Sequence, residues 1–133
     1  MSTIERFEDL EAWKLARAFA SLVYTCSGSG NFGRDFPLRD QVRRASISIV
    51  SNIAEGFERD GDKEFIQFLS IAKGSCGEVR AQLYLALDQK YISEAEFQDL
   101  TTKAIQLSRV ISGLIRYLRQ SQFSGKKYKT AGL

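Results

Sequence analysis

Polar side chains interrupt two otherwise apolar stretches of the sequence, and their types and spacing could support chemistry. The group consists of Arg43, Arg44, Asn52, Glu55, Arg59 and Glu78. Two glutamates that converge between helices could bind a metal ion, but di-metal bundles use paired Glu-x-x-His motifs, and this sequence has no histidine. Residues three and four apart share a helix face, so Asn52, Glu55 and Arg59 can contact one another. We therefore interpret the six residues as a structural polar network that fixes helix register, in preference to a metal site.

A second set of polar residues is basic and lies toward the C-terminal end. No acidic residue follows Asp99, so the first 99 residues carry a net charge of −4 and the last 34 carry +7. Such an asymmetry favours an anionic partner, and basic side chains along a helix can contact the phosphates of RNA or DNA. The candidate nucleic-acid-binding residues are Arg109, Arg116, Arg119, Lys126, Lys127 and Lys129. From charge alone, a solvated helix face followed by a frayed tail is an equally good interpretation.

Catalytic and redox chemistry find little support in the sequence. The absence of histidine removes the commonest general base and the commonest metal ligand. Cys26 and Cys76 stand 50 residues apart with no second cysteine near either, so both are predicted to be small buried side chains. No phosphate-binding glycine loop, nucleophile elbow or HExxH motif is present. We therefore expect a protein that is not an enzyme and that needs no metal or other cofactor.

The elements that position these residues are predicted to be four amphipathic helices in a single domain of 133 residues. Apolar residues recur at spacings of three and four within four segments, approximately 7–26, 37–56, 62–86 and 94–120. Short connections between such helices favour an antiparallel, up-down-up-down four-helix bundle. We expect residues 1–121 to form the bundle and residues 122–133 to form a flexible basic tail. With no apolar signal core and no membrane span, the expected location is cytoplasmic.

The ends of these segments carry recognisable signals. Pro37 suits the first turn of the second helix, Asp62 is predicted to cap the third, and Ser93 with Glu96 forms a capping box before the fourth. The second segment has an additional apolar seam, formed by Ile47, Val50, Ala54 and Phe57, which predicts contact with a neighbouring helix or another subunit.

Two glycines in the third segment are unexpected inside a helix. Each costs about 1 kcal/mol relative to alanine. We therefore predict that Gly74 and Gly77 allow a close backbone approach to small residues of the second helix, namely Ala45, Ser46 and Ser48.

Three parts of the sequence resemble a known family. Residues 9–16 are similar to the pattern DLxVWxxA, residues 41–56 to QxRRAxxSIxxNIAEG, and residues 64–78 to EFxxFLxxAxGSxxE. These are motifs of the 23S rRNA-intervening-sequence proteins, and the resemblance extends over approximately residues 7–120. It implies a left-handed up-down bundle that assembles as a homopentamer, and no enzymatic activity. Related accessory proteins of diversity-generating retroelements are similar basic bundles that associate with a reverse transcriptase and nucleic acid.

Two hypotheses about function follow. The first is an oligomeric, non-catalytic protein that associates with RNA, or with DNA, through its basic surface. The second is a protein-interaction scaffold, for example an accessory subunit that docks a reverse transcriptase or another protein partner. No membrane partner is expected.

Overall fold

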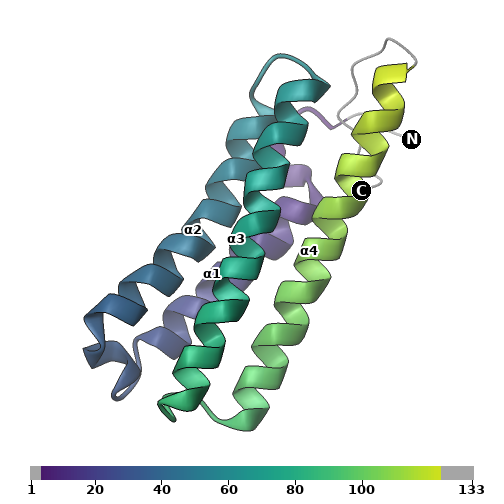
Figure 1. Cartoon of the computed structure of the whole chain (residues 1–133). Coiled ribbons are helices and arrows are strands. Elements are labelled where there is room, and N and C mark those ends of the chain that lie inside the picture. Colours follow the sequence, from purple (N-terminus) through teal and green to yellow (C-terminus); the bar gives the residue numbers. More distant parts are fainter. Residues whose placement is uncertain (1–3, 124–133) are drawn as a thin grey trace.

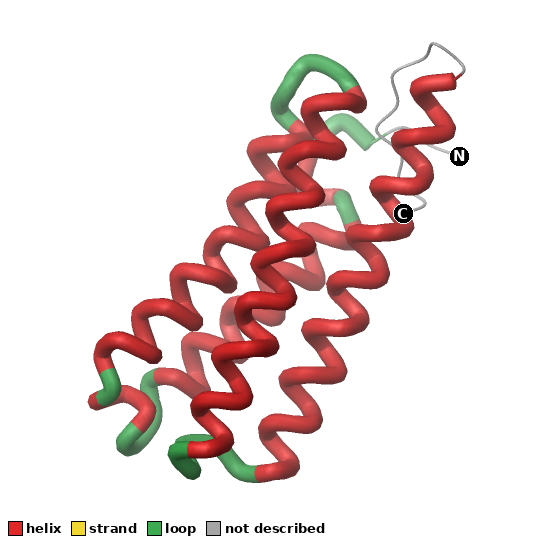
Figure 2. Tube along the Cα trace, viewed as in Figure 1, coloured by secondary structure: helices red, strands yellow, loops and turns green. Residues whose placement is uncertain are grey.

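The structure of the chain is a computed structural model that describes residues 4–123 and the side chains of residues 4–120. Within this part, four α-helices and two short 3-10 turns account for all regular structure (Figures 1 and 2). The helices are α1 (Glu11–Ser27), α2 (Phe36–Phe57), α3 (Asp62–Asp88) and α4 (Glu94–Phe123), and the turns are η1 (Phe7–Asp9) and η2 (Phe32–Arg34).

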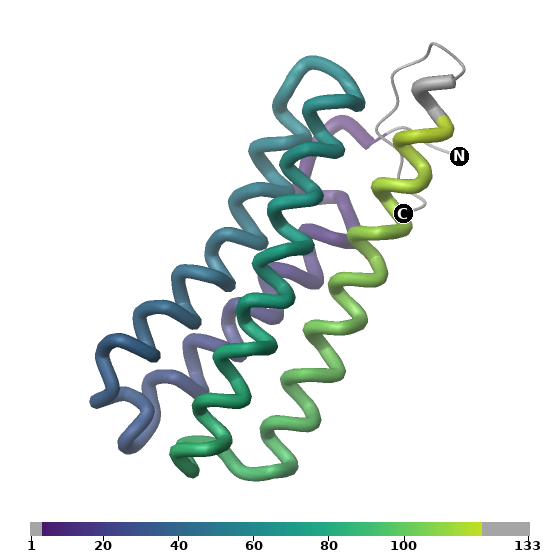
Figure 3. The backbone as a smooth tube through the Cα atoms, in the orientation of Figure 1, coloured from purple at the N-terminus to yellow at the C-terminus, as the bar shows by residue number. Residues whose placement is uncertain are grey.

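The four helices form a ring in which each packs against two neighbours. Contacts join α1 to α2, α2 to α3, α3 to α4, and α4 back to α1. The chain reverses direction at each connection, as the colour change along the tube shows (Figure 3). The predicted antiparallel four-helix bundle is therefore confirmed. None of the described helices is long and apolar enough to cross a membrane.

The core follows the predicted apolar seams closely. On α3 and α4 every seam position is buried, at exposures of 0–5%. These residues are Phe65, Leu69, Ala72, Cys76, Val79, Leu83 and Ala86 on α3, and Phe97, Leu100, Ala104, Leu107, Ile111, Leu114 and Leu118 on α4. The seam spacing of three and four residues keeps one side of each helix facing the bundle axis. Most residues between seam positions face outward, but Ser75 and Ile115 are buried.

Local signals fix where the helices start. The Asp35 side chain accepts a hydrogen bond from the Leu38 amide at 3.2 Å, which caps α2 with Pro37 in its first turn. The Ser93 and Glu96 side chains accept reciprocally from each other's backbone amides at 3.1 and 2.9 Å, so the predicted capping box is confirmed. Asp35 also accepts from the Tyr91 hydroxyl at 2.9 Å, which joins the start of α2 to the α3–α4 connection.

Three boundaries differ from the sequence prediction. The segment before α1 is a 3-10 turn, so the first α-helix begins at Glu11, and α4 continues to Phe123, a few residues beyond Gln120. Asp62 was predicted as the cap of α3, but it is the first residue of the helix and the cap position is Gly61. Gly61 has a φ of 106°, a conformation that favours glycine, and this backbone requirement decides the boundary.

The prediction for the two glycines of α3 is wrong. An added Cβ at Gly74 or Gly77 would meet nothing within 4 Å, so neither residue permits a close approach. The close contact of α2 with α3 is at Gly56, where a Cβ would lie 2.6 Å from Cβ of Phe68. Gly74 and Gly77 are exposed on the outer side of α3, away from its seam.

We expect Gly56→Ala to lower the free energy of unfolding and Gly77→Ala to raise it. A methyl group at Gly56 would force α2 and α3 apart, a cost of about 1–3 kcal/mol for overpacking. At Gly77 the methyl group meets open space, so only the helix propensity changes, in favour of alanine by about 1 kcal/mol. Urea unfolding of both variants measures the difference, and equal shifts would contradict the assigned packing.

Candidate functional site

A groove between α3 and α4 gathers basic and hydroxyl side chains from both helices. It encloses about 620 Å³. Ser70, Lys73 and Gly74 line it from α3, and Ser112, Ile115, Arg116 and Arg119 line it from α4. The two helices lie side by side along this part of the bundle (Figure 1). We call this set of residues the basic groove.

The cations of the basic groove have no partner within the described part of the chain. Lys73, Arg116 and Arg119 make no ion pair or hydrogen bond with any described residue, and no acidic residue lines the groove. On the same helix α4, Lys103 by contrast pairs with Asp99. Three uncompensated positive charges around one depression attract an anion, because no described side chain nearby neutralises them.

The heptad pattern explains why these side chains share the groove. Ile111, Leu114 and Leu118 turn one side of α4 toward the core, which places Arg116 and Arg119 on its exposed side. Ile115 is only 6% exposed and lies against the core at the base of the groove. On α3, Gly74 leaves the space above it open because it has no side chain.

The groove contains only part of the basic set predicted from the sequence. Arg116 and Arg119 line it, whereas Arg109 is exposed on α4 seven residues before Arg116 and does not. Lys126, Lys127 and Lys129 lie outside the described residues. Lys73, Ser70 and Ser112 were not predicted, although the outward position of Lys73 on the α3 seam pattern was a usable signal.

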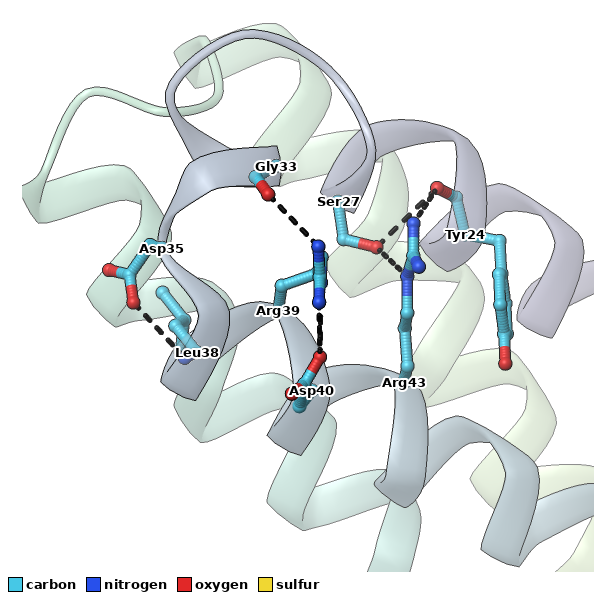
Figure 4. A network of polar contacts seen from close by, with 8 residues as sticks. All are labelled: Tyr24, Ser27, Gly33, Asp35, Leu38, Arg39, Asp40 and Arg43. Carbon is cyan, nitrogen blue, oxygen red and sulfur yellow. Dashed lines mark hydrogen bonds and ion pairs between the residues drawn. The ribbon is translucent and has the colours of Figure 1, made fainter.

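Arg43 contacts the end of α1 rather than other members of the predicted polar network. Its Nε donates to the Ser27 hydroxyl at 2.8 Å and its Nη2 donates to the Tyr24 carbonyl at 3.2 Å (Figure 4). The guanidinium also lies over the Tyr24 ring, 4.5 Å from its centroid. Figure 4 shows Arg39 beside it, donating to the Gly33 carbonyl at 3.2 Å. Arg43 therefore fastens α2 to the end of α1, and Arg39 fastens it to the α1–α2 connection.

Asn52 belongs to a contact between α2 and α3. Its amide donates to the Ser48 carbonyl and hydroxyl at 2.8 and 3.0 Å, and the Ser75 hydroxyl donates to the Ser48 hydroxyl at 2.9 Å. The hydrogen bond between Ser48 and Ser75 helps to fix the register of α2 and α3, because it forms only when these two positions lie side by side.

The remaining members of the predicted network are near the surface. Glu55 pairs with Arg59 at 3.6 Å, and Arg59 also pairs with Glu64 at 3.7 Å. Glu78 accepts from Gln82 at 3.4 Å, and Arg44 is exposed. The structure thus divides the six residues among separate local contacts and does not bring Glu55 and Glu78 together. Among the described residues, no group of three or more potential metal ligands converges.

Comparison with known proteins supplies the family. The model of the 23S rRNA-intervening sequence protein family matches residues 8–113. The chain belongs to this family. Among solved structures, one similar chain is a protein of unknown function from the S23 ribosomal protein family of Bacteroides thetaiotaomicron. It is 21% identical with a TM-score of 0.72, over 79% of this chain and 98% of its own. No curated protein matches significantly.

The family match and the basic groove overlap only in part. Ser70, Lys73, Gly74 and Ser112 lie within the matched residues, whereas Arg116 and Arg119 lie beyond its end at residue 113. The matched residues of the 23S rRNA-intervening sequence protein family therefore include one cation of the groove, Lys73, and exclude the other two.

The two cysteines are poor nucleophiles. Both are free thiols, and Cys76 is buried in the core while Cys26 is half-buried. Burial raises the pKa of Cys26 to about 11 and the pKa of Cys76 to about 12, because it disfavours the thiolate. Both thiols are therefore protonated near neutral pH.

We expect both cysteines to resist modification by Ellman's reagent at pH 8 in the folded protein. A thiol pKa raised from 9.0 to about 11 leaves roughly a hundredth of the thiolate that an ordinary cysteine has, and Cys76 has still less. In concentrated urea both should react completely. Fast reaction of either residue in the folded state, measured by absorbance and mass spectrometry, would contradict this assignment.

Proposed function

We propose that the protein is a non-catalytic, oligomeric four-helix bundle that associates with RNA through its basic surface. The observation that supports this most directly is the convergence of Lys73, Arg116 and Arg119, all unpaired among the described residues, on one groove without an acidic neighbour. Membership of a family associated by its name with rRNA intervening sequences agrees with an RNA partner.

Nucleic acid fits the basic surface better than a small anion does. Arg109 extends the positive charge along α4 by two turns beyond Arg116, about 10 Å at 1.5 Å per residue. A row of cations of that length can contact several successive phosphates of a polymer, whereas a single phosphate would need only the cations of the groove. Contacts of this type produce salt-sensitive binding with little dependence on base sequence.

Oligomer formation is supported by an apolar groove between α1 and α2. Arg17, Ala20, Ser21, Tyr24, Ile47, Val50 and Ser51 line this second depression, of about 400 Å³. Tyr24 and Ile47 are large apolar side chains that are 42% and 45% exposed, and both line this one groove. Ile47 and Val50 belong to the additional seam of α2, for which the sequence predicts contact with another subunit. The family resemblance implies a homopentamer.

The same apolar groove favours a second candidate function, a protein-interaction scaffold. A partner such as a reverse transcriptase would dock by burying Tyr24 and Ile47, and its binding would depend little on salt. RNA binding to unpaired arginines and a lysine depends steeply on salt. Partner binding that persists at a salt concentration which abolishes RNA binding would therefore favour the scaffold.

We expect Arg116→Glu/Arg119→Glu to weaken RNA binding and to flatten its salt dependence. For a single strand, the slope of log K against log salt should decrease by roughly 0.7 for each phosphate that the variant no longer neutralises. Fluorescence anisotropy with a labelled RNA across a salt series measures both quantities.

The matched control is Arg34→Glu/Lys90→Asp, which changes the net charge equally at the opposite end of the bundle (Figure 1). Aspartate suits position 90, where φ is 62°. Equal loss of binding in both double variants would attribute the effect to net charge and contradict a site on α4.

We expect Ile47→Glu to dissociate the oligomer. A carboxylate in the α1–α2 groove would be buried without a partner in an interface between copies, so the assembled state loses stability. Light scattering gives the assembly mass, and circular dichroism verifies that the helices remain. Phe36→Glu removes another exposed apolar side chain, 58% exposed and outside this groove, and should leave the mass unchanged.

A further inference from the structure

Gly74 lines the basic groove without serving the packing of the bundle. A side chain at this position would project into space that no described atom occupies within 4 Å. Glycine weakens a helix relative to alanine, so its presence here is not explained by stability. Because Gly74 has no side chain, the backbone of a ligand in this cationic groove can approach α3 closely.

Two hydroxyl groups in the groove are also without a partner. The side chains of Ser70 and Ser112 form no hydrogen bond within the described part of the chain. Some other helical hydroxyls of the bundle donate to backbone carbonyls, as Thr25 does to Ser21 at 3.0 Å and Ser46 does to Arg43 at 2.9 Å. The hydroxyls in the groove can therefore both donate to and accept from a ligand.

We propose that the basic groove binds the ribose-phosphate backbone of a single RNA strand, in an inference that rests on the proposed function. Lys73, Arg116 and Arg119 contact the phosphates, Gly74 admits the strand, and the hydroxyls of Ser70 and Ser112 hydrogen-bond to a ribose 2′-hydroxyl. Neutral hydroxyls beside unpaired cations match a ligand that carries both an anion and a hydroxyl, and the 2′-hydroxyl distinguishes RNA from DNA.

The apolar floor of the groove favours one strand over a duplex, because the bases of a duplex are paired and stacked inside it and present mainly phosphates and sugars to a protein surface. Ile115 at its base is apolar and buried, so a base or the sugar carbon atoms can rest there without displacing a polar group.

The steric part of the proposal is tested with Gly74→Leu and its control Gly77→Leu. Both glycines are exposed on α3 and face open space, so both substitutions are compatible with folding, but only Gly74 lines the groove. Anisotropy with a labelled single-stranded RNA should show a loss of affinity of about tenfold or more for Gly74→Leu, since a displaced strand moves its phosphates away from the cations. Gly77→Leu should bind as the wild type does. Light scattering should give the wild-type assembly mass for both variants.

The hydroxyl part is tested with Ser70→Ala/Ser112→Ala and two probes of the same base sequence, one RNA and one DNA. The wild type should prefer the RNA strand, and the double variant should lose affinity for RNA while its affinity for DNA stays constant. Equal losses for both strands, or no loss for RNA, would overturn the assigned 2′-hydroxyl contact.

The outcomes separate this inference from the proposed function. Absence of RNA binding by the wild type at low salt would overturn both. RNA binding that is abolished by Arg116→Glu/Arg119→Glu but equal in the two leucine variants would keep the proposed function and overturn the groove as the binding site. An acidic peptide that displaces RNA as effectively as unlabelled RNA does would overturn the ribose assignment.

Discussion

The contact between α2 and α3 is the constraint on which the positions of the other elements depend. At Gly56 the two backbones approach so closely that Phe65 and Phe68 of α3 lie directly against the glycine. Further along the pair, Ser48 and Ser75 share a hydrogen bond that fixes the relative register. Helix α3 in turn packs on α4 as well as α2, so the register set against α2 also decides which α3 residues face α4. The basic groove is a consequence of that register.

The groove also depends on how α4 divides its residues between core and surface. Every seam position from Phe97 to Leu118 is apolar and buried, and the chain carries no acidic residue after Asp99. Arg116 and Arg119 are therefore forced outward without local counter-charges. Lys73 joins them because α3 is antiparallel to α4, which brings the middle of α3 beside the later part of α4.

The helices, their core seams and the capping box could be predicted from the sequence, because these features depend on residues close together in the chain. The periodicity of α3 and α4 was sufficient to identify a seam whose members are all buried in the structure. The cap of α3 was assigned to Asp62 because aspartate is a good capping residue, whereas the turn after α2 demands a positive φ that glycine adopts easily at position 61.

The candidate site was harder to predict because it is formed by residues far apart in the sequence. Arg116 and Arg119 were indicated by the charge asymmetry, but nothing local links them to Lys73. Gly74 and Gly77 were assigned to a helix contact because glycine inside a helix usually permits one, although their positions between seam residues place them outside. The role of Gly56 depends on the helix that packs against it, and a single helix pattern contains no information about its neighbour.

The arrangement of the ring places the two unusual surfaces on opposite sides of the bundle. The apolar groove lies between α1 and α2 and the basic groove between α3 and α4, and these pairs are opposite each other because each helix packs mainly against its two neighbours in the ring. An assembly whose contact surfaces exclude the α3–α4 side would leave one basic groove exposed on each copy. Several weak phosphate sites held together act at a high effective concentration on one polymer, so each groove alone needs only modest affinity. In such an assembly, selectivity for a long nucleic acid over free phosphate would arise from the number of sites and not from the enclosure of any one of them.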